Sequence, residues 1–234
     1  MLQEEFLFRH ELKFRFLYYQ FYRGGTFHCN LCGKGLRKFV QLPGGDRLCP
    51  YCGSLARNRR LWELLQQTYL GNGLRILDFS PSRCLHRQLK RNKSIRYTSS
   101  DYAGEFPSDQ HYDITNIAAP DGNFDLILCY HVLEHVENDR LAMKELHRVL
   151  DTGGTCFIQT PFREGNIYEN ALVRTPEERA LHFGQADHVR IYSAGGLKDR
   201  LETEGFRVEV SKFHSDASNR KGFNPMEYIL IAHK

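Results

Sequence analysis

The run Phe124-Asp-Leu-Ile-Leu-Cys-Tyr130 decides the fold class. It is short, strongly apolar and bounded by turn residues, so it predicts a strand that is buried on both faces. Upstream, the run Arg75-Ile-Leu-Asp-Phe-Ser80 has the same character. A helical pattern over 82–91 and a strand pattern over 95–101 follow it. This alternation of strands and helices predicts a parallel sheet with helices on both faces.

The same alternation continues to the end of the chain. Helices are predicted over 138–150, where Gly153 and Gly154 are expected to stop the first, and over 193–205. Further strands are predicted over 112–114, 155–160, 206–212 and 228–232. No helix separates the last two strands, so the final strand should run antiparallel. The prediction is an α/β protein with a seven-stranded sheet.

Length and composition exclude several classes of protein. The 234 residues suggest one domain plus a smaller unit, and no apolar run approaches the roughly 20 residues of a membrane helix. Charges interrupt the N-terminal region throughout, which is unlike a signal peptide. The seven cysteines are an odd number. We therefore expect a reducing, cytoplasmic setting and no membrane.

Residues 1–26 predict an N-terminal aromatic and basic helix. Leu7, Phe14, Leu17 and Phe21 recur at helical spacing. Such a face most often packs on the body or on a second subunit, which leaves a homodimer open. Aromatic side chains interleaved with basic ones also stack on nucleic-acid bases.

Residues 27–70 predict a zinc-ribbon-like module followed by a linking helix over 54–70, with Ser54 as its N-cap. Cys29-x-x-Cys32 and Cys49-x-x-Cys52 lie 16 residues apart. Two such turns complete a tetrahedral site of four thiolates. The alternative, a redox-active pair, is typical of a single C-x-x-C. A site closed by four protein ligands indicates a structural role for zinc.

Charge is distributed unevenly along the chain. Residues 1–60 carry 11 basic and four acidic residues, a net charge of +7, whereas residues 61–234 carry 21 and 24, a net charge of −3. Zinc bound by four thiolates would lower the net charge of residues 1–60 to about +5. The basic segment is either a solvated face or the binding site of an anionic partner.

The loop after the first strand of the α/β region points to a cofactor without a pyrophosphate. Asp78-Phe-Ser80-Pro81-Ser82 contains no glycine, whereas dinucleotide sites need a glycine-rich turn here. The Ser80 and Ser82 hydroxyls could donate to a carboxylate near the helix N-terminus. Asp101 ends the second strand, 23 residues after Asp78, where an acidic side chain can bind ribose hydroxyls.

A longer stretch carries a family resemblance. Residues 121–136, Asp-Gly-Asn-Phe-Asp-Leu-Ile-Leu-Cys-Tyr-His-Val-Leu-Glu-His-Val, precede Glu145-Leu-His-Arg-Val-Leu150 and Gly153-Gly154. They resemble the region between the fourth and fifth strands of class I S-adenosylmethionine-dependent methyltransferases, nearest to their small-molecule branch. The resemblance covers about residues 75–233 and implies a Rossmann-like S-adenosylmethionine-binding domain over 71–234.

The resemblance also implies a cofactor site. Asp78, Ser80, Pro81 and Ser82 match the first cofactor motif, without its glycines. The other matching positions are the ribose-binding Asp101 and its neighbour Tyr102, the adenine edge at Asp113 and Ile114, and the loop residues Tyr130, His131 and Leu133.

Methyl transfer to a hydroxyl needs a base, and two histidines are the candidate catalytic residues. His131 ends a central strand, where the active site is expected, and His188 lies in the segment 161–192. That segment is too long for a simple connection and suggests a lid or a substrate-binding insertion.

Three functions remain open. The first is methylation of O or N on a small-molecule or glycan-type acceptor. The second is an RNA methyltransferase whose basic zinc module grips phosphate, although no Asn-Pro-Pro-Tyr-type motif follows the fourth strand. The third is a non-catalytic adaptor with a degenerate methyltransferase fold.

Overall fold

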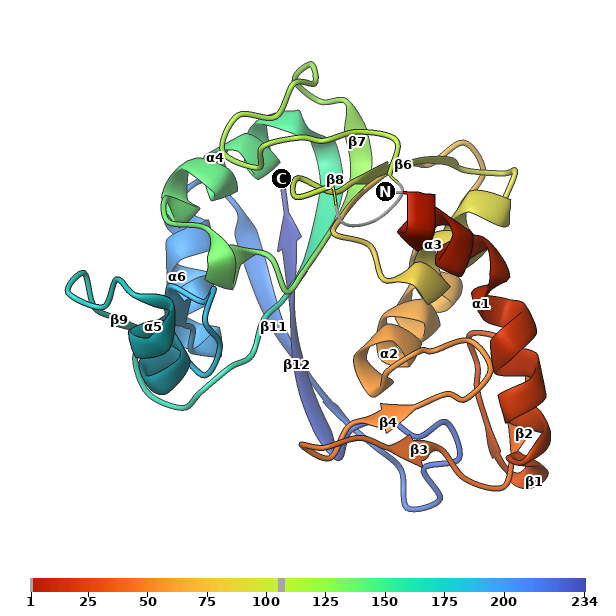
Figure 1. Cartoon of the computed structure of the whole chain (residues 1–234). Helices are drawn as coiled ribbons and strands as arrows, with labels where there is room; N and C mark the ends of the chain where they lie inside the picture. The colour runs from red at the N-terminus through yellow and green to blue at the C-terminus, as the bar shows by residue number, and fades with distance from the viewer. Residues whose placement is uncertain (1, 105–107) are drawn as a thin grey trace.

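The computed structural model describes residues 2–104 and 108–234, apart from the side chains of residues 2–9 and Thr68. A six-stranded sheet with the order β11-β12-β8-β7-β5-β6 forms its centre (Figure 1). The strands are β5 (Arg75–Phe79), β6 (Arg96–Ser100), β7 (Phe124–Tyr130), β8 (Leu150–Gln159), β11 (Arg207–His214) and β12 (Met226–His233).

The directions of the strands confirm the predicted fold class. β6, β5, β7 and β8 are parallel, and β12 is antiparallel to both β8 and β11. The prediction of a strand at 112–114 is wrong. Asp113 forms only an isolated bridge to Asn116, and its carboxylate accepts hydrogen bonds from the backbone and hydroxyl of Thr115. These contacts bend the chain into a turn, so the described sheet has six strands rather than seven.

Helices cover both faces of the sheet (Figure 1). α4 (Asp139–Val149) and α6 (Ala194–Thr203) pack on one face, where Ala142, Leu146 and Leu197 are fully buried. α2 (Ala56–Leu64) and α3 (Arg83–Arg91) cover the other face. Among the described residues, no helix is both long enough and apolar enough to cross a membrane.

Two predicted helix ends are wrong. Ser54 does not cap α2, because Leu55 is the capping residue and its backbone N–H donates to Asn58 Oδ1 at 2.9 Å. At its C-terminal end, α2 continues into a π-helical turn, η1 (Leu65–Tyr69). α4 ends at Val149 because the chain passes directly into β8, and Gly153, with φ of +77°, lies within that strand.

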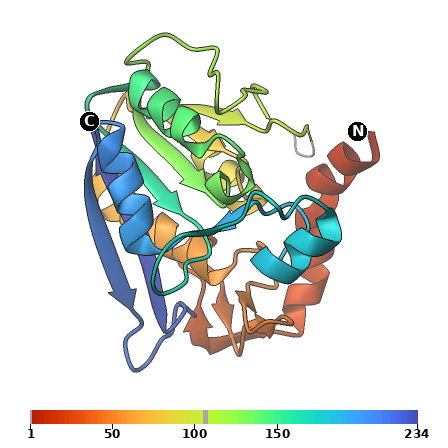
Figure 2. The ribbon, with the colours of Figure 1, turned by 90° about the vertical axis from the view of Figure 1, so that its left-hand side faces the viewer.

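The N-terminal segment forms α1 (Leu2–Gln20) and two small sheets, β1 (Arg23–His28) with β2 (Gly35–Leu36) and β3 (Val40–Gln41) with β4 (Arg47–Leu48). Figure 2 shows α1 along the outer side of these sheets. The prediction that its apolar stripe packs on the body is wrong, since Phe14, Leu17 and Phe21 are exposed. Packing on a second subunit stays a prediction, and the side chain of Leu7 lies outside the described part.

Arg59 joins the cysteine-containing segment to the sheet. Its buried guanidinium donates to four backbone carbonyls and stacks on Phe39 at 4.2 Å. The acceptors are the carbonyl oxygens of Arg47, Ser54, Lys221 and Gly222. The last two belong to the turn between β11 and β12, which thus packs against the N-terminal segment. Both parts therefore share one hydrophobic cluster.

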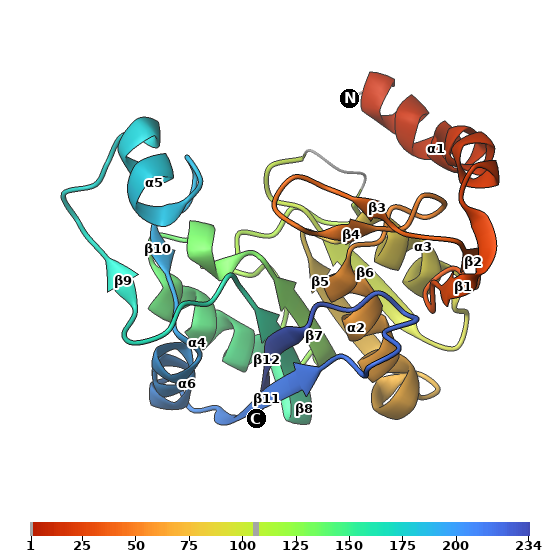
Figure 3. The ribbon, with the colours of Figure 1, turned by 90° about the horizontal axis from the view of Figure 1, so that it is seen from below.

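The 161–192 segment contains β9 (Tyr168–Glu169), α5 (Pro176–Phe183) and β10 (Arg190–Ile191), and α5 projects beyond the sheet (Figure 3). Thr175 and Glu178 form a capping box at the start of α5. Arg190 donates to the Leu133 and Val136 carbonyls, which fastens the segment to the 3₁₀ turn η2 (Leu133–His135).

Candidate active site

The carboxyl ends of β5, β6 and β7 meet at one edge of the sheet and border a cavity of about 490 Å³. Its wall brings together residues that are far apart in the sequence. Six of the predicted cofactor residues line it: Ser80, Asp101, Tyr102, Asp113, Ile114 and His131. Ligands of open α/β sheets bind at this position.

A second cavity, of about 450 Å³, adjoins the first. Phe79, Ser80 and His131 line both cavities. The second is also lined by the other predicted cofactor residues of the two loops, namely Asp78, Pro81, Ser82 and Tyr130. Arg15 of α1 and Arg57 of α2 border it as well. Leu133 is fully buried and lines neither cavity.

The two loops that divide the cavities are strained. Ser80 and His131 have φ of +45° and +56°, in the left-handed region that favours glycine. Hydrogen bonds of 2.8 Å fix both backbones, from Ser80 N–H to the Ser100 carbonyl and from His131 N–H to the Gln159 carbonyl. Ser80 thus adopts a glycine-like conformation without a glycine. Strain of this kind persists where the surrounding structure enforces it, often at functional sites.

The acidic side chains at this edge have different environments. Burial raises the pKa of Asp78 to about 7, although a hydrogen bond from Tyr97 opposes the shift. Asp101 is 4% exposed. Asp113 is half-buried, and its carboxylate already accepts two hydrogen bonds from Thr115. The Tyr130 hydroxyl is buried and has no hydrogen-bond partner among the described residues.

The two predicted catalytic histidines occupy different places. His131 lies between the cavities, with its Nδ1 3.1 Å from Oε1 of Glu134. His188 is 3% exposed and lines neither cavity. Its ring meets that of His135 edge to face at 4.7 Å. Burial, and then the nearby His135, lower the pKa of His188.

The sequence profile of the methyltransferase domain family matches residues 54–210, about two thirds of the chain. The chain belongs to this methyltransferase family. A probable S-adenosylmethionine-dependent methyltransferase of Mycolicibacterium smegmatis is 29% identical over 108 residues, or 45% of this chain. That match spans 38% of the length of the mycobacterial protein.

Solved structures share the fold of this chain. An S-adenosylmethionine-dependent methyltransferase from Archaeoglobus fulgidus superimposes with a TM-score of 0.55 at 18% identity, over 75% of this chain and 91% of that one. The cyclase SpnF superimposes with a TM-score of 0.57, also at 18% identity, over 84% of this chain and 86% of that one. At this identity the likeness shows the fold alone, and the fold carries more than one chemistry.

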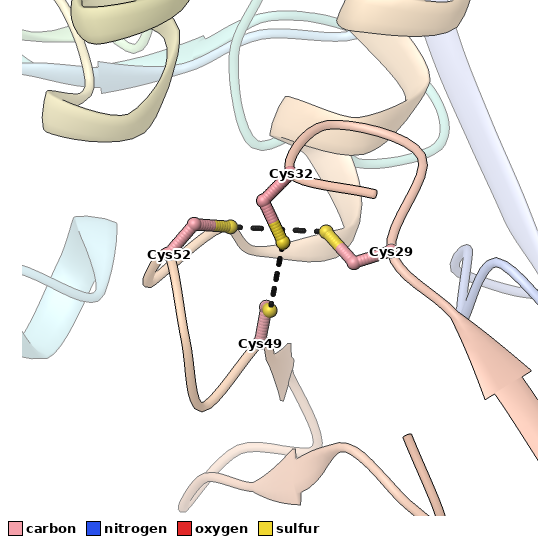
Figure 4. Close-up of side chains that lie close together, drawn as sticks. All are labelled: Cys29, Cys32, Cys49 and Cys52. Atoms are coloured by element: carbon pink, nitrogen blue, oxygen red, sulfur yellow. Dashed lines mark hydrogen bonds between the residues drawn. The ribbon is translucent and has the colours of Figure 1, made fainter. Parts of the chain in front are cut away.

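The four predicted metal ligands converge, as Figure 4 shows. Sulfur–sulfur distances are 3.7 Å for Cys29–Cys52 and 3.8 Å for Cys32–Cys49. Thiolates about 2.3 Å from a tetrahedral zinc lie about 3.8 Å apart, so this donor set fits zinc. Each C-x-x-C turn closes in the same way: the N–H of the glycine after it donates to the carbonyl of its first cysteine, at 2.8 Å for Gly33 and 2.9 Å for Gly53.

One cluster of potential ligands was not predicted from the sequence. Glu134, His135 and His188 bring ligand atoms within 4.8 Å of one another. Glu134 and His135 are adjacent in the sequence, but His188 lies more than 50 residues further on. Only the folding of the 161–192 segment onto η2 brings them together, and no local pattern signals that contact.

Proposed function

We propose that the chain transfers the methyl group of S-adenosylmethionine to an oxygen or nitrogen atom of a small-molecule or glycan-type acceptor. The observation that carries the proposal is the pair of adjoining cavities that share Ser80 and His131. One cavity suits the nucleoside of the cofactor, and the other suits the acceptor and, next to the boundary, the methionine part of the cofactor. The reacting methyl group would then lie at their boundary.

The proposed cofactor position crosses the boundary between the two cavities. The Asp101 carboxylate would bind the ribose hydroxyls, with Tyr102 beside it, and Asp113 and Ile114 would border the adenine. Ser80, Pro81 and Ser82 would lie along the methionine part, where the helix N-terminus after Ser82 favours a carboxylate. Leu133 would support the loop from beneath, because it is fully buried.

The second cavity supports an acceptor of modest size. Its volume of about 450 Å³ is within the usual range for small-molecule sites. Arg15 and Arg57 offer hydrogen-bond donors to a polar acceptor such as a sugar. The zinc module and α1 form one side of this cavity, so zinc would serve the site by holding that side in place.

The chemistry is a displacement at the sulfonium methyl group. Alignment of the acceptor atom, the methyl carbon and the sulfur supplies much of the rate. For a hydroxyl acceptor, His131 is the proposed base, since it lies at the boundary of the two cavities and the Glu134 carboxylate, 3.1 Å from its Nδ1, orients the ring. We propose that His188 positions the His135 ring and does not contact the acceptor.

The experiment incubates zinc-loaded protein with methyl-labelled S-adenosylmethionine and separate small-molecule, RNA and protein fractions of a cell extract. We expect label in the small-molecule fraction, and its loss in Asp101→Asn. Label in RNA would instead support a nucleic-acid methyltransferase. A folded chain that transfers no label to any fraction would contradict the proposed activity.

A further inference from the structure

We propose that Glu134, His135 and His188 form a second metal site, which binds one divalent cation beside the cofactor cavity. The ligand atoms of these three residues lie within 4.8 Å of one another. The set contains two imidazoles and one carboxylate. Three protein ligands leave a coordination position open, unlike the closed four-cysteine site.

Burial of Glu134 is the first argument. The residue is 1% exposed, and neither of its carboxylate oxygens accepts a hydrogen bond from the described residues. The nearest ionisable group is the His131 imidazole, whose Nδ1 lies 3.1 Å from Glu134 Oε1. A buried carboxylate with unsatisfied oxygens is costly, because desolvation penalises its charge. A bound cation would remove that cost.

His135 is oriented by an outer contact, as metal-binding imidazoles usually are. His135 Nδ1 lies 3.1 Å from the carboxylate of Asp187, which leaves the opposite ring nitrogen for a metal. The His188 ring lies edge to face against that of His135, with the ring centroids 4.7 Å apart. His135 therefore has one nitrogen engaged by Asp187 and one left for an ion.

Hydrogen bonds fix the backbone around the cluster. Val189 N–H donates to the Glu134 carbonyl at 2.9 Å, which pairs the segment carrying His188 with η2. The Arg190 side chain donates to the carbonyls of Leu133, Val136 and Glu137. These bonds hold two segments distant in sequence in register, so the three ligands are positioned before any ion arrives.

The donor set selects the class of ion. Imidazole favours transition metals, whereas carboxylate also suits Mn²⁺. A set of two histidines and one carboxylate with an open position therefore fits Zn²⁺, Mn²⁺ or Fe²⁺ better than Mg²⁺ or Ca²⁺. The cluster borders the cavity of about 490 Å³ through His135, which lines it.

The ion would act on an acceptor hydroxyl that reaches from the cavity of about 450 Å³ past His131, which lines both cavities, and this consequence rests on the proposed function. A hydroxyl bound to the ion would lose its proton more readily. Its oxygen would form the bond to the methyl carbon while the carbon–sulfur bond breaks and leaves its electron pair on sulfur. The hydroxyl proton would pass to His131, and S-adenosylhomocysteine would be the other product.

The test counts bound ions on the zinc-loaded full chain. Mn²⁺ is titrated and followed by electron paramagnetic resonance, since thiolates are poor ligands for Mn²⁺ and the cysteine site keeps its zinc. Zn²⁺ is titrated in parallel and counted by native mass spectrometry. We expect one additional ion per chain from either probe. Asp187→Asn, an exposed change, should weaken binding about 10- to 100-fold, and His135→Gln should weaken it further.

His214→Gln is the matched control, because this exposed histidine lies on β11, outside the cluster. It should keep the second ion. The site would be refuted if neither probe bound beyond the zinc of the cysteine site, or if His135→Gln and Glu134→Gln bound as tightly as the wild type. Ion binding without methyl transfer would overturn the proposed function and keep the site. Methyl transfer by a chain that binds no second ion would overturn the second metal site and keep the proposed function.

Discussion

The phenol of Tyr97 on β6 donates a hydrogen bond of 2.9 Å to the Asp78 carboxylate on the neighbouring strand β5. Asp78 is almost fully buried and borders the cavity of about 450 Å³. Burial raises its pKa to about 7, so the carboxyl is neutral below this pH and anionic above it. Its charge therefore changes close to neutral pH, beside a site proposed for a cationic cofactor.

This charge change predicts pH-dependent cofactor affinity. S-adenosylmethionine carries a sulfonium and an ammonium group, so the anionic form of Asp78 favours it. If only that form binds, affinity should rise about tenfold between pH 6 and pH 8, as the carboxyl ionises through pH 7. Isothermal titration calorimetry at both pH values measures it. Asp78→Asn should remove the dependence, and an unchanged slope in that variant would contradict the assignment.

Asp101 is predicted to supply the main polar contact to the cofactor ribose. Asp101→Ala should weaken binding of S-adenosylhomocysteine by about 1.5–3 kcal/mol, the usual contribution of a hydrogen bond to a charged group. Asp199→Ala, at an exposed position on α6, is the control and should bind normally. Equal affinities for the two variants would show that the ribose lies elsewhere.

Ser80 is predicted to carry backbone strain. With φ of +45° it lies in a region that costs a non-glycine residue about 1–2 kcal/mol, and glycine would recover part of this despite its greater entropy loss. Ser80→Gly should therefore raise the free energy of unfolding by about 0.5–1 kcal/mol. Thermal denaturation measures it. Ser82→Gly, where φ is −64°, should give no gain.

The four-cysteine site is predicted to hold one zinc ion that stabilises the N-terminal segment. Cys49→Ser should lower the zinc content and expose the surface around Arg59, detected as faster hydrogen exchange over β1–β4. Cys84→Ala is the control, because this buried cysteine lies outside the cluster and should leave zinc stoichiometry unchanged. Full zinc occupancy in Cys49→Ser would argue against the assigned ligands.

Arg59 is predicted to be essential for attachment of this segment. Methionine in its place would leave four carbonyls, two of them in buried and two in part-buried hydrogen bonds, without their donor, at about 1 kcal/mol each. Arg59→Met should therefore lower the free energy of unfolding by at least about 3 kcal/mol, as measured by urea denaturation. A change below about 1 kcal/mol would mean that water replaces the guanidinium at these carbonyls.

The sequence predicted the elements whose signals are local. Apolar runs such as 75–80 and 124–130 became β5 and β7 because their burial requires only a sheet with two covered faces. The cysteine cluster was predictable for the same reason, since ligand spacing is a property of the chain itself. The positive φ of Ser80 could not be predicted, because serine rarely adopts positive φ and glycine is the residue expected at such a position.

The failures arise from competition between local and tertiary contacts. The Asp113 carboxylate accepts two hydrogen bonds from Thr115, and the chain bends there instead of forming the predicted strand. Gly153 and Gly154 are typical of a helix end, but both lie within strand β8. The cluster of Glu134, His135 and His188 depends on Arg190 fastening a distant segment to η2, and no sequence window contains both partners.

The central claim is that the edge of the sheet beyond β5, β6 and β7 binds the methyltransferase cofactor. Native mass spectrometry of the zinc-loaded chain with S-adenosylhomocysteine tests it most directly. The account predicts one S-adenosylhomocysteine per chain in addition to the zinc of the cysteine site, and loss of that adduct in Asp101→Ala. A folded, zinc-loaded wild-type chain with no adduct would contradict it.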